Sequence, residues 1–184
     1  SGKKIEPRDI PFSKKLPYMP SERGFDDCFQ GEMIRYWANY DLEGNSIDKQ
    51  HIIDNRFRID VQTEAALTFI DRNHKTPFFF YLSYFGPHVP LEATKKYLDR
   101  FPGEMPERRR HALAMLSAID DGVGAIRSLL NQYGVLDNTI IFFISDNGAP
   151  LKIHKEDIPL SFKGGAWDGS LNDPYIGEKG MLSE

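Results

Sequence analysis

Two short apolar runs on either side of a long amphipathic segment constrain what this chain can fold into. The first is TPFFFYLSYF, residues 76–85, and the second is TIIFFIS, residues 139–145. Each is too short for a long helix, and a continuous apolar run of this length is typical of a strand buried on both faces. Between them, residues 106–133 carry apolar side chains at the spacing of one helix face. Two such strands joined through a helix predict a parallel βαβ unit.

The remaining segments extend this pattern into a fold class. A second helix is predicted over residues 54–73, where one face is apolar, and a short helix over 91–100. The order helix, strand, helix, strand indicates an α/β fold with a mostly parallel sheet flanked by helices. Residues 1–25 contain four prolines among scattered charges and predict an irregular arm without regular elements. Residues 26–184 are expected to belong to one domain, in which 149–184 form long functional loops or partly mobile chain.

Charge and apolar content argue against two kinds of partner. The net charge of −4 gives no general attraction to nucleic acid, and the basic run ERRRH, 107–111, is interpreted as a solvated helix end. No apolar run approaches the roughly 20 residues of a membrane span. The single cysteine, Cys28, cannot form an internal disulfide. The chain begins SGKK without a signal peptide, and we expect it to be truncated at both ends.

Polar residues follow both predicted strands at the point where each strand ends. His88 follows the first strand, and Asp146 and Asn147 follow the second. Parallel strands end at the same edge of a sheet, where ligands bind in open α/β folds, so we expect these residues to converge. Carboxylate and amide oxygens suit a hard cation such as Ca²⁺ or Mg²⁺. A hairpin turn at Asp146–Gly148 fits the spacing equally well, and the residues alone leave both interpretations open.

Other charged residues have simpler interpretations on local grounds. His88, held between two prolines, fits a loop histidine bonded to a carbonyl group. Lys179, in the glycine-rich GEKG, fits a surface lysine, although its ammonium could also approach a bound anion. Asp120 and Asp121 resemble paired carboxylates, but they lie within the predicted helix, which favours a packing or surface role over acid–base chemistry.

Several segments together resemble one family. These are RGFDDCFQG, PFFFYLSYFGPHVP, AMLSAIDDGVGAI followed by GVLDNTIIFFISDNG, and GEKGMLSE. In their order and spacing they resemble the sulfatase family, the formylglycine-dependent sulfuric ester hydrolases of the alkaline phosphatase superfamily, over roughly residues 22–184. The resemblance implies an alkaline-phosphatase-like α/β domain that hydrolyses a sulfate ester, with a sulfated small molecule or glycan as its partner. It also implies a secreted, periplasmic or lysosomal protein.

The resemblance implies a role for four residues. Asp146 and Asn147 match two ligands of a divalent cation, usually Ca²⁺, with Mg²⁺ as the other candidate. His88 matches a histidine that contacts the sulfate and helps the leaving oxygen depart. Lys179 matches a lysine that binds the sulfate. The cation and Lys179 would stabilise the charge that develops on the transferred group.

The chain departs from the family pattern at its nucleophile. The family's formylglycine is made from Cys or Ser in a C/S-x-P-S-R motif, which this sequence lacks. Cys28 stands in DDCFQG, where Asp26 and Asp27 disfavour a thiolate. The resemblance therefore implies the middle of a sulfatase domain, with the formylglycine outside it, and we expect these residues alone to be inactive. The alternatives are a phosphatase or phosphodiesterase of the same superfamily and a non-catalytic α/β binding module. The oligomeric state stays open.

Overall fold

The computed structural model describes residues 12–31, 33–150, 155–161, 166–172, 174 and 177–181. These fall into two compact units, Ser1–Asp54 and Asn55–Glu184. The division lies well after residue 25, where the sequence suggested that an arm gives way to a domain. In the described part of the chain, no helix is both long and apolar enough to cross a membrane.

The first unit contains a small antiparallel sheet that the sequence analysis did not predict. Its strands are β1 (Phe29–Gly31), β2 (Arg35–Tyr40) and β3 (Ser46–Ile53), in the order β1-β2-β3. Alternate side chains of β2, those of Tyr36, Ala38 and Tyr40, are buried, as expected for a sheet with one covered face. The signal in the sequence was this period of two, followed by a glycine-containing turn into β3.

The expectation of an irregular arm over residues 1–25 is wrong where the structure describes it. A short helix, α1 (Phe12–Lys15), is followed by two 3₁₀ turns, η2 (Leu16–Tyr18) and η3 (Pro20–Glu22). Proline lies at the first or second position of both turns. Proline suits the start of a helical turn because its fixed φ matches and its missing N–H is not needed there. Residues 1–11 of the arm lie outside the described residues.

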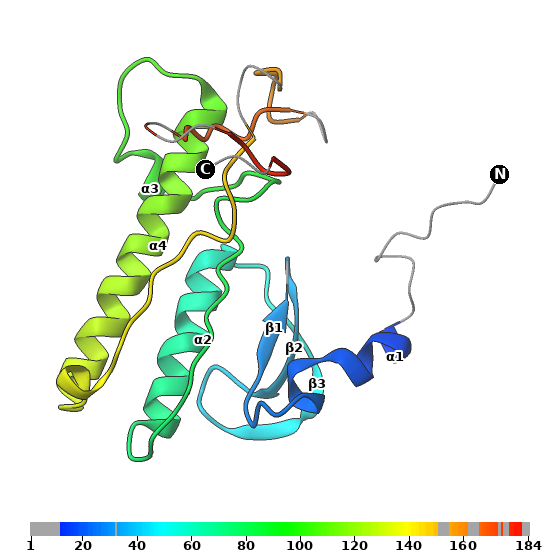
Figure 1. Ribbon diagram of the computed structural model, residues 1–184, viewed down its shortest axis with the longest axis vertical. Coiled ribbons are helices and arrows are strands. Elements are labelled where there is room, and N and C mark those ends of the chain that lie inside the picture. Colours follow the sequence, from blue (N-terminus) through cyan, green and yellow to red (C-terminus); the bar gives the residue numbers. More distant parts are fainter. Residues whose placement is uncertain are drawn as a thin grey trace. The chain divides into compact units, whose positions relative to one another are not determined.

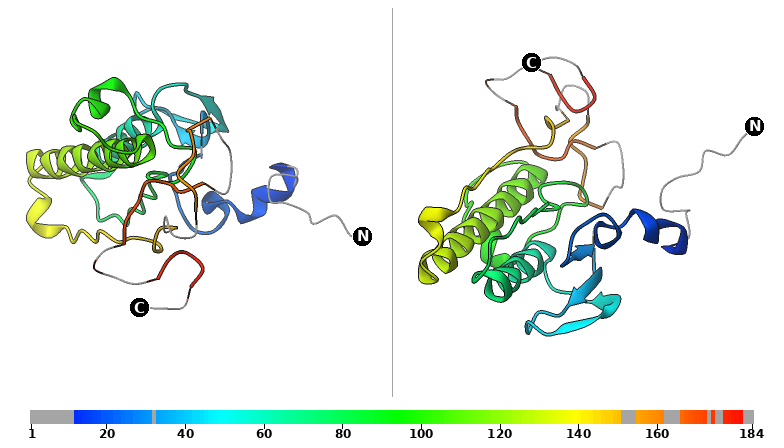
Figure 2. Two further views of the ribbon diagram at one scale, coloured as in Figure 1. Left: turned by 90° about the horizontal axis from the view of Figure 1, so that it is seen from above. Right: turned by 60° about the horizontal axis from the view of Figure 1, so that its bottom comes forward.

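The second unit is built on the two helices that the sequence predicted. They are α2 (Arg58–Asn73) and α4 (Glu107–Gln132), which pack side by side (Figures 1 and 2). A one-turn helix, α3 (Lys95–Leu98), lies within the predicted 91–100 segment, and the 3₁₀ turn η4 (Leu136–Asn138) follows α4. Among the described residues, one buried hydrophobic cluster of this unit comprises Ile59, Tyr97, Ala114, Met115, Ala118 and Ile119.

A row of small residues lets α4 approach its neighbours closely. Ala114, Ala118 and Gly122 recur at every fourth position of α4, and all three are buried. A Cβ on Gly122 would lie 2.3 Å from the Tyr84 hydroxyl and 2.5 Å from Oγ1 of Thr63. The Tyr84 and Thr63 hydroxyls are themselves hydrogen-bonded at 2.8 Å. Gly122 therefore leaves room for the polar contact that joins α2 to the segment before His88.

The two segments predicted as buried strands are extended, but the expected pairing of the two is not confirmed. Among the described residues, neither 76–85 nor 139–145 belongs to a hydrogen-bonded ladder. Both run in the same direction, opposite to the helices that precede them (Figure 1). A ladder needs at least one hydrogen-bonded partner strand, and the described residues supply none to either segment.

The first extended segment is held by α2 through one of its faces. Phe80 stacks on Phe69 with 4.5 Å between ring centroids, and Gln62 hydrogen-bonds two backbone groups of the segment, at Ser83 (3.2 Å) and Phe85 (3.1 Å). The opposite face of this segment is exposed, with Phe79 and Tyr81 77% and 71% accessible. In the second segment both faces are exposed: Ile140 and Phe142 are 82% and 81% accessible, and Phe143 is 76% accessible. The first segment thus alternates like a strand with one buried face. The second segment is apolar like a buried strand, but among the described residues its side chains are not covered.

Cys28 is a buried thiol in the first unit. Its side chain is 6% exposed, and its backbone N–H donates to Oδ1 of Asn39 at 2.8 Å. Burial raises the pKa of Cys28, and the nearby Asp27 carboxylate adds a smaller effect of the same sign. The sequence analysis predicted the direction of this effect but attributed it to the two aspartates, whereas desolvation of the thiolate is its main cause.

We predict that Gly122→Ala destabilises the protein whereas Gly124→Ala does not. The new methyl group at 122 must displace Tyr84 and Thr63, and overpacking of this kind costs about 1–3 kcal/mol. Gly124, one half-turn further along α4, has no atom within 4 Å of its would-be Cβ. Alanine there should stabilise the helix by up to about 1 kcal/mol. Urea unfolding of both variants checks this, and equal effects would contradict the close approach at Gly122.

We also predict that Cys28 reacts slowly with a thiol reagent in the native protein. A buried thiol with a raised pKa presents little thiolate at neutral pH. Labelling by a disulfide reagent should therefore be at least about tenfold slower in buffer than in urea, where the desolvation disappears. The release of the coloured thiol measures both rates. Fast native labelling would show that Cys28 is accessible and activated.

Candidate functional site

The loop after the first extended segment fixes the tautomer of His88. The backbone N–H of His88 donates to the Phe85 carbonyl at 3.1 Å, and the two rings pack edge to face with 5.4 Å between centroids. Nδ1 of His88 lies 2.7 Å from the Val89 carbonyl oxygen. That oxygen only accepts hydrogen bonds, so Nδ1 carries the proton. Among the described residues, Nε2 of the exposed imidazole has no hydrogen-bond partner, and the prediction of a histidine bonded to a carbonyl group is confirmed.

Arg58, at the start of α2, braces both sides of this loop. It is 1% exposed, and its guanidinium lies 4.1 Å from the centre of the Phe85 ring. Its Nε donates to Oε1 of Glu92 at 2.5 Å, and Nη2 donates to the Pro90 carbonyl at 3.4 Å. A buried guanidinium is stable only when its donors are paired. Arg58 thus ties the residues before and after His88 to one helix.

Arg58 is not among the residues predicted from the sequence, although a signal was available. A positive charge in the first turn of a helix is unfavourable because that end of the helix dipole is itself positive. An arginine in such a position, beside apolar core residues, indicates that it pairs with something outside its own helix. Here the partners are Phe85, Pro90 and Glu92.

Asp146 and Asn147 follow the second extended segment on an exposed bend. The Ser145 hydroxyl donates to the Asn147 carbonyl at 2.8 Å and stabilises the bend. Among the described residues, neither the Asp146 carboxylate nor the Asn147 amide side chain has a hydrogen-bond partner. No strand of the described chain pairs with 139–145 after the bend, so the hairpin interpretation finds no partner strand.

The donor atoms of Asp146 and Asn147 fit part of a hard-cation site. Ca²⁺ takes six to eight oxygen ligands, and these two side chains offer a carboxylate and an amide oxygen. The described residues contain no group of three or more His, Cys, Asp or Glu side chains that could hold a metal ion. The two residues therefore suit Ca²⁺ or Mg²⁺ better than zinc, but they do not make a complete site among themselves.

The loop that carries Lys179 lies against the Asp146–Asn147 bend. It turns tightly, with the Met181 N–H donating to the Glu178 carbonyl at 2.9 Å, and the Lys179 side chain is exposed. A Cβ built on Gly148 would lie 3.7 Å from Cα of Glu178. The structure thus brings the loop of the predicted cation ligands into contact with the loop of the predicted sulfate-binding lysine.

Asn172 connects these two loops. Its Oδ1 accepts the Ala149 N–H at 3.1 Å, and its Nδ2 donates to the Ala149 carbonyl at 2.9 Å and to the Gly177 carbonyl at 2.7 Å. Asn172 is not among the residues predicted from the sequence. By contrast, His88 makes no hydrogen bond or ion pair with Asp146, Asn147 or Lys179 in the described part of the chain, so its convergence with them stays a prediction.

The basic run at the start of α4 is not the solvated helix end that the sequence suggested. Arg108 is 3% exposed and donates to three backbone carbonyls, those of Ile158 (2.5 Å), Pro159 (2.9 Å) and Trp167 (3.2 Å). Arg109 donates to the Gly169 carbonyl at 3.0 Å. Irregular backbone leaves carbonyls without ladder partners, and a guanidinium with five N–H donors can satisfy several at once. These arginines anchor the glycine-rich segment to α4.

The acidic pair within α4 has a structural role, as predicted. Asp121 forms a two-pronged ion pair with Arg100, with both N–O distances at 2.8 Å. These hydrogen bonds lower the pKa of Asp121. Asp120 points to solvent. The pair joins the loop after α3 to α4 and lies outside the candidate site.

Comparison with known proteins identifies the family. The sequence profile of the Sulfatase family matches residues 10–177. Arylsulfatase J of Mus musculus is 26% identical over 185 residues, which cover 89% of this chain and 31% of that protein. N-acetylgalactosamine-6-sulfatase of Mus musculus is 41% identical over 91 residues, which cover 48% of this chain and 16% of that protein. The chain thus spans less than a third of the length of either relative.

Solved structures agree on the fold. The crystal structure of Ps i-CgsB superposes with a TM-score of 0.69 at 27% identity, over 91% of this chain and 39% of that one. A second crystal structure of Ps i-CgsB, in complex with k-i-k-neocarrahexaose, gives a TM-score of 0.59 at 29% identity, over 72% of this chain and 34% of that one. Because the Sulfatase profile covers most of the sequence and these structures share its alkaline-phosphatase-like α/β fold, this chain belongs to the sulfatase family.

Proposed function

We propose that the whole protein hydrolyses a sulfate ester, and that the sulfate binds where the Asp146–Asn147 bend meets the loop of Lys179. The observation that carries this proposal is the contact between these two loops through Asn172. It holds oxygen donors suited to a cation beside a loop that carries an ammonium group. Two positive charges on one side of a sulfate would stabilise the negative charge that builds up during transfer.

We infer that residues 76–85 and 139–145 are parallel strands of a sheet completed by chain outside the described residues. Their common direction and their exposed apolar faces support this (Figure 1). Burial of such faces is favourable at about 25 cal/mol per Å² of apolar surface, so a cover is expected. At the shared carboxyl edge of such a sheet, His88 would lie near Asp146 and Lys179.

In this proposal, different residues of the chain bind the cation and the sulfate. Asp146 and Asn147 would hold the Ca²⁺ or Mg²⁺ ion, which when bound supplies a fixed positive charge beside the sulfate oxygens. Lys179 would bind another sulfate oxygen through its ammonium group. In this proposal the formylglycine nucleophile lies outside these residues, as the family resemblance implies, and this chain would contribute binding and proton transfer.

His88 is suited to protonate the leaving oxygen. The Val89 carbonyl holds the proton on Nδ1, so a second proton on the ring must sit on Nε2. The resulting imidazolium can donate from Nε2 to the oxygen of the departing alcohol. Arg58 keeps this ring in place from behind through Phe85.

We propose a sulfated sugar as the substrate class. Among the similar proteins, one is named an N-acetylgalactosamine-6-sulfatase and one is seen in complex with k-i-k-neocarrahexaose. The alkoxide oxygen of a sugar hydroxyl is a poor leaving group unless it is protonated, which fits a site with a proton donor at His88. A secreted, periplasmic or lysosomal location remains a proposal that rests on the family resemblance.

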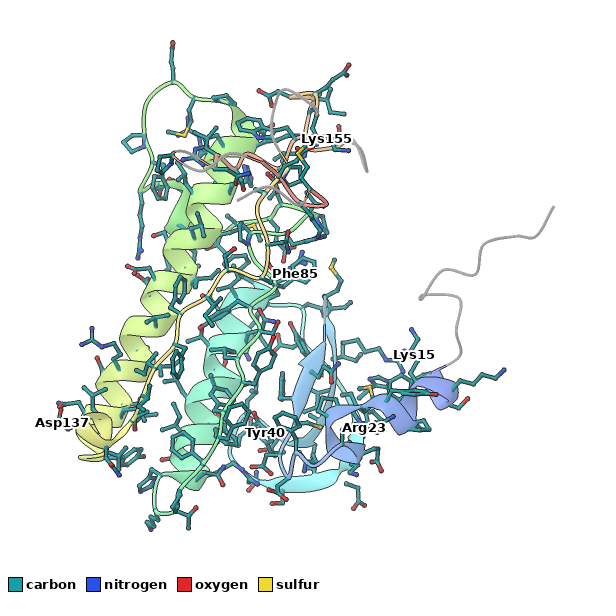
Figure 3. The ribbon with its side chains drawn as sticks, in the orientation of Figure 1. Lys15, Arg23, Tyr40, Phe85, Asp137 and Lys155 are labelled. Atoms are coloured by element: carbon teal, nitrogen blue, oxygen red, sulfur yellow. The ribbon has the colours of Figure 1, made fainter. Side chains whose placement is uncertain are left out.

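The cation assignment predicts that Asp146→Ala lowers kcat/KM for an aryl sulfate by at least about 100-fold in the whole protein. Asn147→Ala, which removes a neutral ligand, should cost about tenfold. Asp137→Ala is the matched control, because Asp137 lies beside the last turn of α4, at the other end of the same segment (Figure 3). Release of the phenol measures turnover, and calorimetry measures Ca²⁺ binding. Unchanged Ca²⁺ affinity in Asp146→Ala would refute the assignment.

The same assay separates the sulfatase from its main alternative. The whole protein should hydrolyse the aryl sulfate at least about tenfold faster than the matching aryl phosphate, because a single cation with an Asn ligand suits the less charged ester. Preference for the phosphate would favour the phosphatase interpretation. Hydrolysis of neither, with Ca²⁺ bound, would favour a binding module.

The proton-donor role predicts that the effect of His88→Ala depends on the leaving group. A nitrophenol departs easily without a proton, whereas a sugar alcohol does not, so the loss should approach about 100-fold or more for a sugar sulfate and be much smaller for nitrophenyl sulfate. His111→Ala is the control, since Nδ1 of His111 also lies near a carbonyl, that of Glu107, at 3.0 Å. Rates for the two substrates are compared across pH. An equal loss on both would contradict proton donation.

A further inference from the structure

Asn172 stands on an anchored base. Arg108 and Arg109 of α4 bind the carbonyls of Trp167 and Gly169, and the indole N–H of Trp167, which is 3% exposed, donates to the Ser170 carbonyl at 2.8 Å. A Cβ on Gly169 would lie 2.2 Å from the Arg108 carbonyl oxygen, so this stretch runs directly against the helix. Residues 167–170 are therefore held against α4, and they fix the position of the backbone just before Asn172.

From this base the Asn172 amide reaches both loops with complementary chemistry. It accepts from and donates to the backbone of Ala149 as a neighbouring strand would, and its second N–H binds Gly177. One acceptor and two donors are thus used on one short side chain. Aspartate has the same size but lacks the donors, and alanine lacks all three bonds.

Resting on the proposed function, we propose that Asn172 is a positioning residue of the sulfate site, which sets the separation between the cation ligands Asp146 and Asn147 and the ammonium of Lys179. Asn172 acts through Ala149, two residues after Asn147, and through Gly177, two residues before Lys179. Both charges must reach one sulfate at once, and a misplacement of about 1 Å in such a site costs about 100-fold in rate.

The physical part of this proposal is tested by hydrogen exchange in the whole protein. In Asn172→Ala, the Ala149 amide loses its acceptor and the loop of Lys179 loses a bond, so exchange should rise at least about fivefold both at Ala149 and at Met181. Leu171→Ala is the matched control, because Leu171 is the adjacent residue and is 59% exposed. It should change neither amide. Unchanged exchange in Asn172→Ala would overturn the proposal.

The functional part is tested by a double-mutant cycle on kcat/KM for nitrophenyl sulfate, with Lys179→Ala as the second change. Asn172→Ala should lower the value at least about tenfold when Lys179 is present and less than about twofold when it is absent. Equal factors in both backgrounds would mean that Asn172 only supports folding, and would overturn the proposal. Asn172→Asp, which preserves volume, should also lose at least about tenfold; full activity in it would overturn the need for the Gly177 bond.

These outcomes separate the inference from the function on which it rests. If the unmodified whole protein hydrolyses no sulfate ester, the proposed function fails, whatever the exchange data show. If it does hydrolyse the ester, and Asn172→Ala raises exchange without lowering kcat/KM, the function stands and the positioning role is wrong.

Discussion

Close contact between α2 and α4 is the constraint on which the second unit depends. Small side chains along one face of α4 let the two helices and the segment before His88 share a core. The Tyr84 hydroxyl, paired with Thr63, sits in the space left by Gly122. The loop around His88 takes its position from α2 through Arg58, and the segment that leads to Asn172 takes its position from α4 through Arg108. Buried arginines therefore hold the loops of the site in fixed positions relative to the packed helices.

Buried guanidinium groups suit this task for a physical reason. The loops of an α/β domain are irregular and leave carbonyl oxygens without ladder partners. Water can satisfy those oxygens only at the surface, whereas Arg108 satisfies three of them while itself 3% exposed. Desolvation makes such a charge costly unless all of its donors are used, which favours a single arrangement of the surrounding backbone.

Local patterns predicted the helices and the family but not the supports of the site. The periodicity of 54–73 and 106–133 identified α2 and α4 with small errors at their ends, because helix periodicity is a property of nearby residues. The order of short motifs revealed the sulfatase family and four candidate residues. The sequence did not reveal the roles of Asn172, Arg58 and Arg108. Each of these side chains binds carbonyl groups that lie 5 to 59 residues away in the sequence. The antiparallel sheet of the first unit was overlooked although its alternating pattern was present.

The exposed apolar faces of residues 76–85 and 139–145 have a consequence for how such a protein is made. A strand with free backbone groups and aromatic side chains pairs readily with any other strand that it meets. If the two segments are strands of the sheet proposed above, this surface can pair with a second copy of the chain before its own neighbouring strands cover it. A sheet assembled from distant parts of a chain closes slowly, which lengthens that exposure. Protein yield in cells would thus depend on chaperones that shield the half-formed sheet, and mutations that slow closure would reduce abundance without altering the chemistry of the finished site.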